Sequence, residues 1–470
     1  MSMTQRQLPA RRLSSMLGER HGEQPAYSWL SEGIRQLVTN GRVLHGTMLP
    51  SERELVGALG LSRTTVTRAY QELRERGFAE ARQGSGTQIT IPGGNVGGGF
   101  EPLTPGSPEL GAPGGIDLTC GAPTAPTGLA GYYERALDHL PGYIGGMGYY
   151  PLGLPVLREA IAADYARRGL PTSPDQIIVT AGALSGVASI ARAVLGPGAR
   201  VLAESPSYPN SVSSLRQHGA RLTALPIGPE GSDVSGIETA LERGGFSAML
   251  CLPDFHNPTG TLLGDEGRER WARALDRSGV HGIVDETNAE LWLDARPEVS
   301  PMAKYSNNLI TVGSASKTYW GGLRLGWIRA PHALVGAIHQ GRATMDLGAP
   351  VLEQIVLSLL ITERAGVDDS TRTRLRENRD WLHAGLADLA PEWKIRKPPG
   401  GMSLWCNLPA PRSMALAAQA KKSGLALTPG SVFAVNDHGL DRWLRVPYAL
   451  DRSELEVALP LLADAWKAVA

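Results

Sequence analysis

Lys317 is the residue whose type and setting are best suited to covalent chemistry in this sequence of 470 residues. It follows an apolar run at residues 309–312 that predicts a buried strand, and two serines and a Gly-Gly-Leu-Arg turn flank it. A lysine amine condenses with an aldehyde to form a Schiff base, and nearby hydroxyls and an arginine can hold a phosphate. None of the other six lysines has this setting. The pattern predicts a Schiff-base site at Lys317, and an exposed loop lysine is the alternative.

The elements that would position partners for Lys317 are short apolar runs that alternate with helical patterns. The runs lie at residues 177–179, 200–203, 248–252, 282–284 and 309–310. This alternation predicts an α/β domain with a mostly parallel sheet and helices on both faces, whose ligands gather at the carboxyl ends of the strands.

The first two of these strand ends carry groups suited to a phosphate and an aromatic ring. Residues 180–186 turn from a strand into a helix, and the free amides of Ala183 and Leu184 would favour a phosphate there. Tyr208, after the next strand, could lie flat against an aromatic ring. The alternatives are an ordinary glycine turn and a tyrosine of the core.

The next two strand ends carry a carboxamide and a carboxylate. Asn257 could donate a hydrogen bond to a phenolate oxygen, although Asn-Pro is also a simple turn signal. Asp285 directly follows an apolar run and could pair with a protonated ring nitrogen, because a buried carboxylate needs a cationic partner. A structural salt bridge is the alternative for Asp285.

In this order, and with the segment YPLGLPVLREAI at residues 150–161, these residues resemble fold-type I aminotransferases over most of residues 116–470. The resemblance implies pyridoxal 5'-phosphate, an internal aldimine at Lys317, ring-nitrogen pairing by Asp285 and a small C-terminal α/β subdomain from about residue 355. It also implies a substrate-carboxylate contact at Arg445, for which a surface ion pair is the alternative. The remaining implied cofactor contacts are Ala183, Leu184, Tyr208, Asn257, Ser314, Ser316 and Arg324.

Residues 1–92 have a different pattern, in which two helices joined by a short turn precede a hairpin. Ser51 and Glu54 form a capping box for the first helix, and Ser62 caps the second, at residues 63–73. In that second helix, at about 100° per residue, the apolar side chains fall on one side and the arginines, threonines and Gln71 on the other. Such a polar face can contact phosphates and base edges in a major groove, or it is simply solvated.

The basic charge of the chain is concentrated in the same residues. Residues 1–92 contain twelve arginines and no lysine against eight glutamates and no aspartate, a net charge of +4 in a chain of net zero. The patterns at residues 49–55, 62–70 and 84–87 resemble a GntR-type winged helix-turn-helix, which implies binding of double-stranded operator DNA. The contacts that this resemblance implies are Ser51, Arg53, Arg63, Thr64, Thr65, Arg68, Gly84, Ser85 and Gly86.

Residues 93–115 are dense in glycine and proline and predict a flexible linker between the two units. The three cysteines are far apart and fit no metal spacing, so we expect no metal site and a reducing cytoplasm. No segment resembles a signal peptide, and no apolar run approaches the roughly 20 residues of a membrane span.

A GntR-type module ahead of an aminotransferase-like domain is similar to the layout of MocR-type transcriptional regulators. That resemblance implies a head-to-tail homodimer in which an amine, amino-acid or vitamer effector acts through the Lys317 aldimine. Two residues depart from the family: Thr287 stands where a tyrosine usually reaches the cofactor, and Asn210 stands where some relatives have a second substrate-binding arginine. A working aminotransferase with a DNA-binding appendage and a cofactor-free sensor remain the alternatives.

Overall fold

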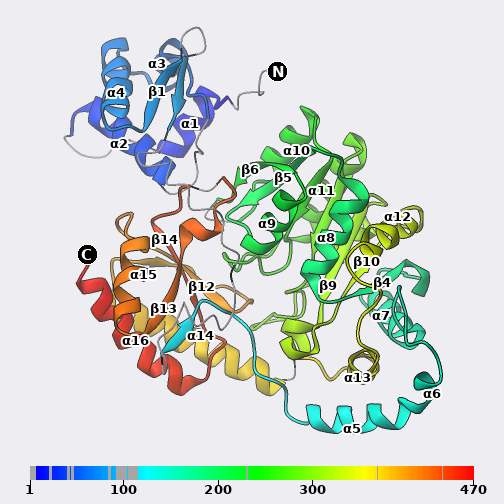
Figure 1. Cartoon of the computed structure of the whole chain (residues 1–470). Coiled ribbons are helices and arrows are strands. Elements are labelled where there is room, and N and C mark those ends of the chain that lie inside the picture. The colour runs from blue at the N-terminus through cyan, green and yellow to red at the C-terminus, as the bar shows by residue number, and fades with distance from the viewer. Residues whose placement is uncertain are drawn as a thin grey trace.

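The computed structural model describes residues 7–18, 20, 24–39, 43, 47–82, 86–90, 103, 115–228, 231–367, 369–436 and 438–470. The described chain forms three parts: an N-terminal module, a large domain around a seven-stranded sheet, and a C-terminal subdomain around a five-stranded sheet (Figure 1).

The N-terminal module is a helical bundle followed by a two-stranded hairpin. Its elements are α1 (Ala10–Leu17), α2 (Ala26–Thr39), α3 (Glu52–Leu59), α4 (Arg63–Glu75), β1 (Ala79–Arg82) and β2 (Gly86–Ile89). Ser51 and Glu54 form the predicted capping box of α3, and the hydroxyl of Ser62 accepts a hydrogen bond from the Thr65 amide at the start of α4. The predicted apolar face of α4 is buried in the core of the module. These features confirm the predicted winged helix-turn-helix.

The large domain is built on a sheet in which six of the seven strands are parallel. In spatial order the strands are β4 (Ile177–Thr180), β10 (Gly326–Arg329), β9 (Leu309–Ser314), β8 (His281–Asp285), β7 (Ala248–Cys251), β5 (Arg200–Ser205) and β6 (Arg221–Pro226). Strand β10 runs antiparallel to both of its neighbours. All five predicted strands are present, and β6 and β10 were not predicted.

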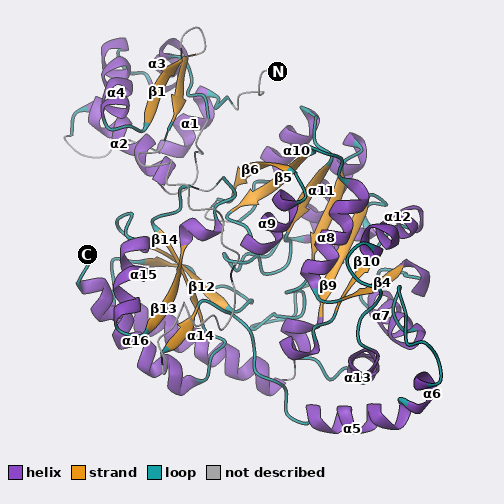
Figure 2. Cartoon of the chain, viewed as in Figure 1, coloured by secondary structure: helices purple, strands orange, loops and turns teal. Residues whose placement is uncertain are grey.

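Alternate residues of each strand enter two different cores, as the pleat of a strand requires. On β7, for example, Met249 and Cys251 belong to one core and Ala248 and Leu250 to the other. Helices cover both cores, and Figure 2 shows them in purple on the two sides of the orange sheet.

The first core is covered by α5 (Leu129–His139), α7 (Pro155–Arg167), α10 (Val234–Glu242), α11 (Asp265–Ser278) and α13 (Val351–Thr362). The second is covered by α8 (Ala183–Val194), α9 (Pro209–Gln217) and α12 (His332–Ala343). A short helix, α6 (Pro141–Ile144), follows α5. This arrangement confirms the predicted α/β class.

The C-terminal subdomain packs helices on a second sheet. Its strands, in spatial order, are β11 (Lys394–Ile395), β12 (Ser403–Asn407), β14 (Trp443–Pro447), β13 (Leu425–Pro429) and β3 (Ile116–Leu118). Its helices are α14 (Asp369–Leu389), α15 (Ser413–Lys422) and α16 (Arg452–Lys467). Because β3 pairs in parallel with β13, the residues that directly follow β3 lie between the two sheets.

Within the part of the chain that the structure describes, no helix has the length and apolar character needed to cross a membrane.

Candidate functional site

A cavity of about 380 Å³ lies where the carboxyl ends of the large-sheet strands face the C-terminal subdomain. Its lining includes every residue that the sequence predicted for a cofactor and an effector carboxylate. These are Ala183, Leu184, Tyr208, Asn257, Asp285, Ser314, Ser316, Lys317, Arg324 and Arg445. The structure therefore brings together ten residues spread over more than 260 positions of sequence. Their individual roles stay predictions.

Lys317 lies in a π-helical turn (Ser316–Trp320) directly after β9. Its Nζ donates a hydrogen bond to the backbone carbonyl of Gly121, which follows β3. Burial lowers the pKa of the Lys317 amine, and the carboxylate of Asp285 acts in the opposite direction. A lowered pKa increases the neutral fraction of the amine, which is the form that attacks an aldehyde.

Asp285 ends β8 and faces the same cavity. One of its carboxylate oxygens accepts a hydrogen bond from the Thr287 amide at 2.9 Å. Burial raises the pKa of Asp285, because an ionised carboxylate in this setting lacks the solvation of water. A cation in the cavity, such as a protonated ring nitrogen, would restore the ionised form.

The N-terminus of α8 forms an anion-binding corner of the cavity. Its N-cap is Gly182, which has a φ of +90° and supplies no side-chain cap, so the first amides of the helix remain free. A Cβ built on Gly182 would lie 3.0 Å from Nη2 of Arg324, so a glycine is needed for the guanidinium to approach this closely. A helix N-terminus, an arginine and the nearby Ser314 and Ser316 suit a phosphate group.

Arg445, on β14, brings a buried guanidinium into the cavity from the other sheet. Its Nη1 lies 3.4 Å from Oδ1 of Asn257, and its Nη2 donates to the carbonyl of Thr119. Its Nε has no hydrogen-bond partner in the described chain. Burial lowers the pKa of Arg445 to about 10. A buried guanidinium with an unused N–H suits a ligand carboxylate.

Together these groups fit a phosphorylated aromatic aldehyde. The cavity has an anion corner at α8, an amine at Lys317, a carboxylate at Asp285, and the aromatic ring of Tyr208 in its wall. Its volume is within the range of about 300–1,000 Å³ that is usual for small-molecule sites.

The structure also adds residues that the sequence did not predict. Thr119, Cys120, Gly121 and Ala122 line the cavity because β3 joins the C-terminal sheet. A three-residue strand has no periodic signal that could have identified them. Leu103, from the predicted linker, lines the cavity as well, and most of that linker lies outside the described residues.

Both main-chain groups of Leu103 are held by Asn210 on α9. The Leu103 amide donates to Oδ1 of Asn210 at 2.7 Å, and Nδ2 of Asn210 donates to the Leu103 carbonyl at 2.9 Å. The residue that departs from the family pattern therefore binds the chain's own linker. The sequence identified Asn210 as the residue that follows Tyr208-Pro209, but it could not identify the hydrogen-bond partner of Asn210.

The predicted DNA contacts lie at the start of α3 and along α4. Arg63 is highly exposed, with Glu52 at 3.8 Å, and Thr64 and Arg68 are also exposed. The guanidinium of Arg68 lies 3.7 Å from the ring centroid of Tyr27. The hydroxyl of Ser51 is engaged in the α3 cap and Thr65 contacts Ser62.

Of the remaining predicted DNA contacts, Arg53 is exposed on α3, and Gly86 begins β2 with a φ of +95°. Gly84 and Ser85 lie outside the described residues. A metal site was not predicted, and the described residues contain no cluster of three or more His, Cys, Asp or Glu side chains that could hold an ion.

Comparison with known proteins gives two family matches. Residues 146–462 match the aminotransferase class I and II family, and residues 26–89 match the gntR family of bacterial regulatory proteins.

The chain is similar over nearly its whole length to an HTH-type transcriptional regulator of Bacillus subtilis, YisV, with 27% identity over 96% of this chain and 98% of the relative. It is 27% identical to the HTH-type transcriptional regulator TauR of Rhodobacter capsulatus, over 86% of this chain and 89% of the relative. Among solved structures it is similar to the α-aminoadipate aminotransferase LysN of Thermus thermophilus, complexed with N-(5'-phosphopyridoxyl)-L-leucine. That match has a TM-score of 0.69 and 27% identity, and it covers 77% of this chain and 94% of the other.

Proposed function

The chain belongs to the aminotransferase class I and II family and carries a gntR-family domain ahead of it, and from this premise we propose that it is a MocR-type transcriptional regulator. In this proposal residues 1–92 bind operator DNA, residues 93–115 link the two units, and residues 116–470 bind pyridoxal 5'-phosphate and an effector. The regulator would act in the cytoplasm, where its DNA is.

The residues of the cavity would each hold one part of the cofactor. The amides of α8 and Arg324 would bind its phosphate, Tyr208 would stack on its ring, and Asp285 would pair with its ring nitrogen. When bound, pyridoxal 5'-phosphate supplies an aldehyde that reacts reversibly with amines, so that Lys317 and an effector amine compete for it. Burial lowers the pKa of the Lys317 amine and so increases its neutral, reactive fraction.

The effector class follows from Arg445. A buried guanidinium with a free Nε suits an anionic group, and a ligand that also reacts with the aldehyde needs an amine. An amino acid has both groups, and we therefore propose an amino-acid effector, with other amines or a vitamer as the alternatives to test.

The observation that carries the regulatory proposal is the contact between Asn210 and Leu103. Leu103 belongs to the segment that leads to the DNA-binding module, and it lines the same cavity as Lys317. A ligand in the cavity can therefore change the position of the linker directly. Such control requires different effector affinities in the DNA-bound and the free states, because equal affinities would shift nothing.

We also propose the head-to-tail homodimer of the family. The end of α6 and the segment after it support this, since Ile144 and Met147 have exposed fractions of 70% and 90%. Large apolar side chains at neighbouring exposed positions commonly mark an interface. Light scattering of the purified protein should give twice the chain mass.

The decisive experiment measures operator binding by fluorescence anisotropy with the protein saturated with pyridoxal 5'-phosphate, across a panel of amino acids and amines. We expect one class of effector to change the affinity of the wild type. In Asn210→Leu that change should be largely lost, although the effector still alters the visible spectrum of the cofactor. The matched control is Gln217→Leu, because Gln217 is an exposed carboxamide on the same helix.

If no effector changes DNA binding by the wild type, the regulatory proposal fails. The second candidate function is amino-acid transamination, which the combination of Lys317, Asp285 and Arg445 in one cavity favours. Sustained keto-acid formation by the purified protein, rather than a single turnover, would support that alternative.

A further inference from the structure

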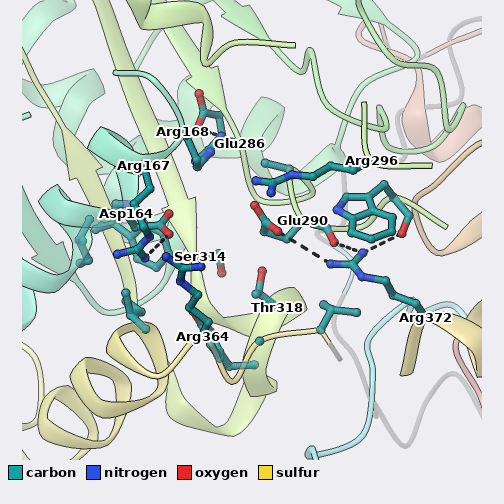
Figure 3. A pocket seen from close by; sticks show the side chains of 18 of the residues that line it. Asp164, Arg167, Arg168, Glu286, Glu290, Arg296, Ser314, Thr318, Arg364 and Arg372 are labelled. Atoms are coloured by element: carbon teal, nitrogen blue, oxygen red, sulfur yellow. Dashed lines mark hydrogen bonds and ion pairs between the residues drawn. The ribbon is translucent and has the colours of Figure 1, made fainter. Parts of the chain in front are cut away.

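A second cavity, of about 530 Å³, borders the turn that carries Lys317 (Figure 3). It contacts this turn through Thr318 and Tyr319, and Ser314 lines both cavities. We call it the arginine cavity, because five arginines from four segments of the chain line it: Arg167, Arg168, Arg296, Arg364 and Arg372. Neither the cofactor nor the proposed effector requires it.

Three of the five arginines have acidic partners in or beside the cavity. Arg168 pairs with Glu286 at 2.9 Å, Arg167 with Asp164 at 2.8 Å, and Arg372 lies 3.9 Å from Glu290. The backbone carbonyls of Glu290 and Trp292 also accept hydrogen bonds from Arg372, each at 2.8 Å.

The side chains of the other two, Arg296 and Arg364, have no ion-pair or hydrogen-bond partner among the residues that the structure describes. Figure 3 shows both side chains extending into the space between the labelled residues, from different segments of the chain. The one further acid of the lining is Asp369, which is exposed at the start of α14. Both arginines are exposed, and an anion bound in the cavity would offset the positive charge of their guanidinium groups.

Arg364 also adopts a backbone conformation that an arginine rarely has. It follows α13 with a φ of +56°, the left-handed region that favours glycine. Its amide donates to the Ile361 carbonyl at 3.2 Å, and the amide of Ala365 donates to the Leu360 carbonyl at 2.9 Å. These two bonds form a Schellman motif, in which glycine is the usual residue at this position. An arginine that replaces the favoured glycine and extends into a cavity indicates a use for its side chain.

The arginine cavity lies where the large domain connects to the C-terminal subdomain, so a ligand bound there would affect both parts. Helix α13 packs in the core of the large domain, whereas α14 packs in the core of the C-terminal subdomain. Arg364 lies in the connection between them, and Arg296 lies in the loop between β8 and β9. A ligand held by both would tie this connection to the large domain beside the Lys317 turn.

We propose that the arginine cavity binds a small dianion, either a phosphate or a dicarboxylate, through Arg296 and Arg364. Each guanidinium presents a planar fork that matches two oxygens of a phosphate or a carboxylate. The hydroxyl of Thr318, which also lines the cavity, adds a further polar group. This site is distinct from the cofactor phosphate corner at α8.

Titration calorimetry of the full chain saturated with pyridoxal 5'-phosphate tests the proposal. Saturation blocks the first phosphate corner, so that added phosphate reports the second site. Succinate can also bind at Arg445, and the arginine variants separate binding at that residue from binding in the arginine cavity. Inorganic phosphate and succinate are the two probes, each compared with sodium chloride at equal ionic strength. We expect one saturable site per chain for at least one probe. The probe that binds more tightly shows whether the natural ligand is a phosphate or a dicarboxylate.

The test variant is a double variant that combines Arg296→Gln with Arg364→Gly. The control is Arg273→Ala, which removes an exposed arginine of α11. The double variant should bind at least about tenfold more weakly, and the control should bind as the wild type does. Arg364→Gly alone should keep or raise the thermal midpoint without anion, because glycine is favoured at this position. A lower midpoint would show that Arg364 serves the fold and would overturn the proposal. Equal anion affinity of the double variant and the wild type would also overturn the proposal, as would the absence of saturable binding of either probe to the wild type.

Discussion

At the scale of single residues, burial sets the reactivity of the cofactor cavity. It lowers the pKa values of Lys317 and Arg445 and raises that of Asp285. Each shift favours the uncharged form, and each would be reduced by a ligand of opposite charge or by a hydrogen-bonding ligand. Burial of these groups in their charged forms is electrostatically costly, which favours binding of a cofactor that carries charges of both signs.

Removal of the amine at position 317 should abolish covalent capture of the cofactor. We expect Lys317→Ala, incubated with pyridoxal 5'-phosphate, to lack the visible band of the wild type and to remain unlabelled after borohydride reduction. Absorption spectra and mass spectrometry of peptides measure the two results. The control is Lys304→Ala, because Lys304 belongs to the large domain but does not line the cavity. Labelling of another lysine in the wild type would contradict the assignment.

The buried carboxyl of Glu204 should make the stability of the folded chain depend on pH. This carboxyl is buried on β5, and burial raises its pKa from 4.5 to about 7, against the opposing effect of hydrogen bonds from Ser232 and Leu252. Between these two values the unfolded chain loses the proton while the folded chain keeps it, so the contribution to stability is lost as pH rises. At pH 8, Glu204→Gln should therefore be more stable than the wild type, by up to about 3 kcal/mol.

Denaturation by urea at pH 5 and pH 8 measures this difference, which should be much smaller at the lower pH. Glu134→Gln is the control, because Glu134 is exposed on α5. A pH-independent difference between Glu204→Gln and the wild type would argue against a neutral carboxyl at this position.

At the scale of secondary-structure elements, α4 separates packing from recognition. Val66, Ala69, Tyr70 and Leu73 are buried, and the arginines and threonines of the opposite face remain accessible. The ring of Tyr27, on α2, supports the guanidinium of Arg68 from one side, which restricts its motion before DNA binds. Arg63 is held less firmly, because among the described residues its ion-pair partner is Glu52 alone, at 3.8 Å, and its side chain is 84% exposed.

Alanine at either arginine should weaken operator binding without affecting the cofactor. We expect a cost of about 1–3 kcal/mol for Arg63→Ala and for Arg68→Ala if each contacts a base edge, and a smaller salt slope if it contacts a phosphate. Anisotropy titrations across a salt series distinguish the two cases. Arg277→Ala, in the large domain, removes the same charge and should bind as the wild type does. Unchanged binding by both recognition-helix variants would count against the predicted contacts.

At the scale of the whole molecule, the DNA-binding module contacts the rest of its own chain through an ion pair. Arg12, on α1, pairs with Asp233, which caps the N-terminus of α10 in the large domain. Both side chains are partly exposed, at 46% and 31%, so the pair contributes little to stability. We therefore expect its loss to affect the orientation of the module rather than the stability of the fold.

Loss of this pair should release the module while leaving the fold intact. In Arg12→Ala we expect a larger radius of gyration and a thermal midpoint within about 2 °C of the wild type. Small-angle scattering measures the radius, and added salt should move the wild type toward the variant, because salt screens exposed charges. Arg11→Ala removes the neighbouring exposed arginine and should leave the radius unchanged. Identical scattering from all three proteins would show that the pair does not set the orientation.

Local patterns in the sequence, together with the family resemblance, were sufficient for the fold class, for five strands of the large sheet and for the ten residues of the cofactor cavity. Apolar runs and helix caps depend only on residues that are neighbours in the sequence. They predicted β4, β5, β7, β8, β9 and the two helices of the DNA-binding motif. They did not predict β6 and β10 of the same large sheet, which carry weaker signals. The first three residues of β6 (RLTALP) are not fully buried, and β10 (GWIR) begins with a glycine and ends with an arginine, so neither strand forms a continuous apolar run.

Only the tertiary structure decided which distant residues meet. Leu103 and Asn210 are 107 positions apart, and the arginines of the second cavity come from α7, the connection after α13, α14 and the loop after β8. No periodicity connects such residues, because their proximity depends on the packing of whole elements. The chemistry of the Lys317 site was therefore evident in the sequence, whereas the route from that site to the linker, and the unpaired charge of Arg296 and Arg364, follow from the fold alone.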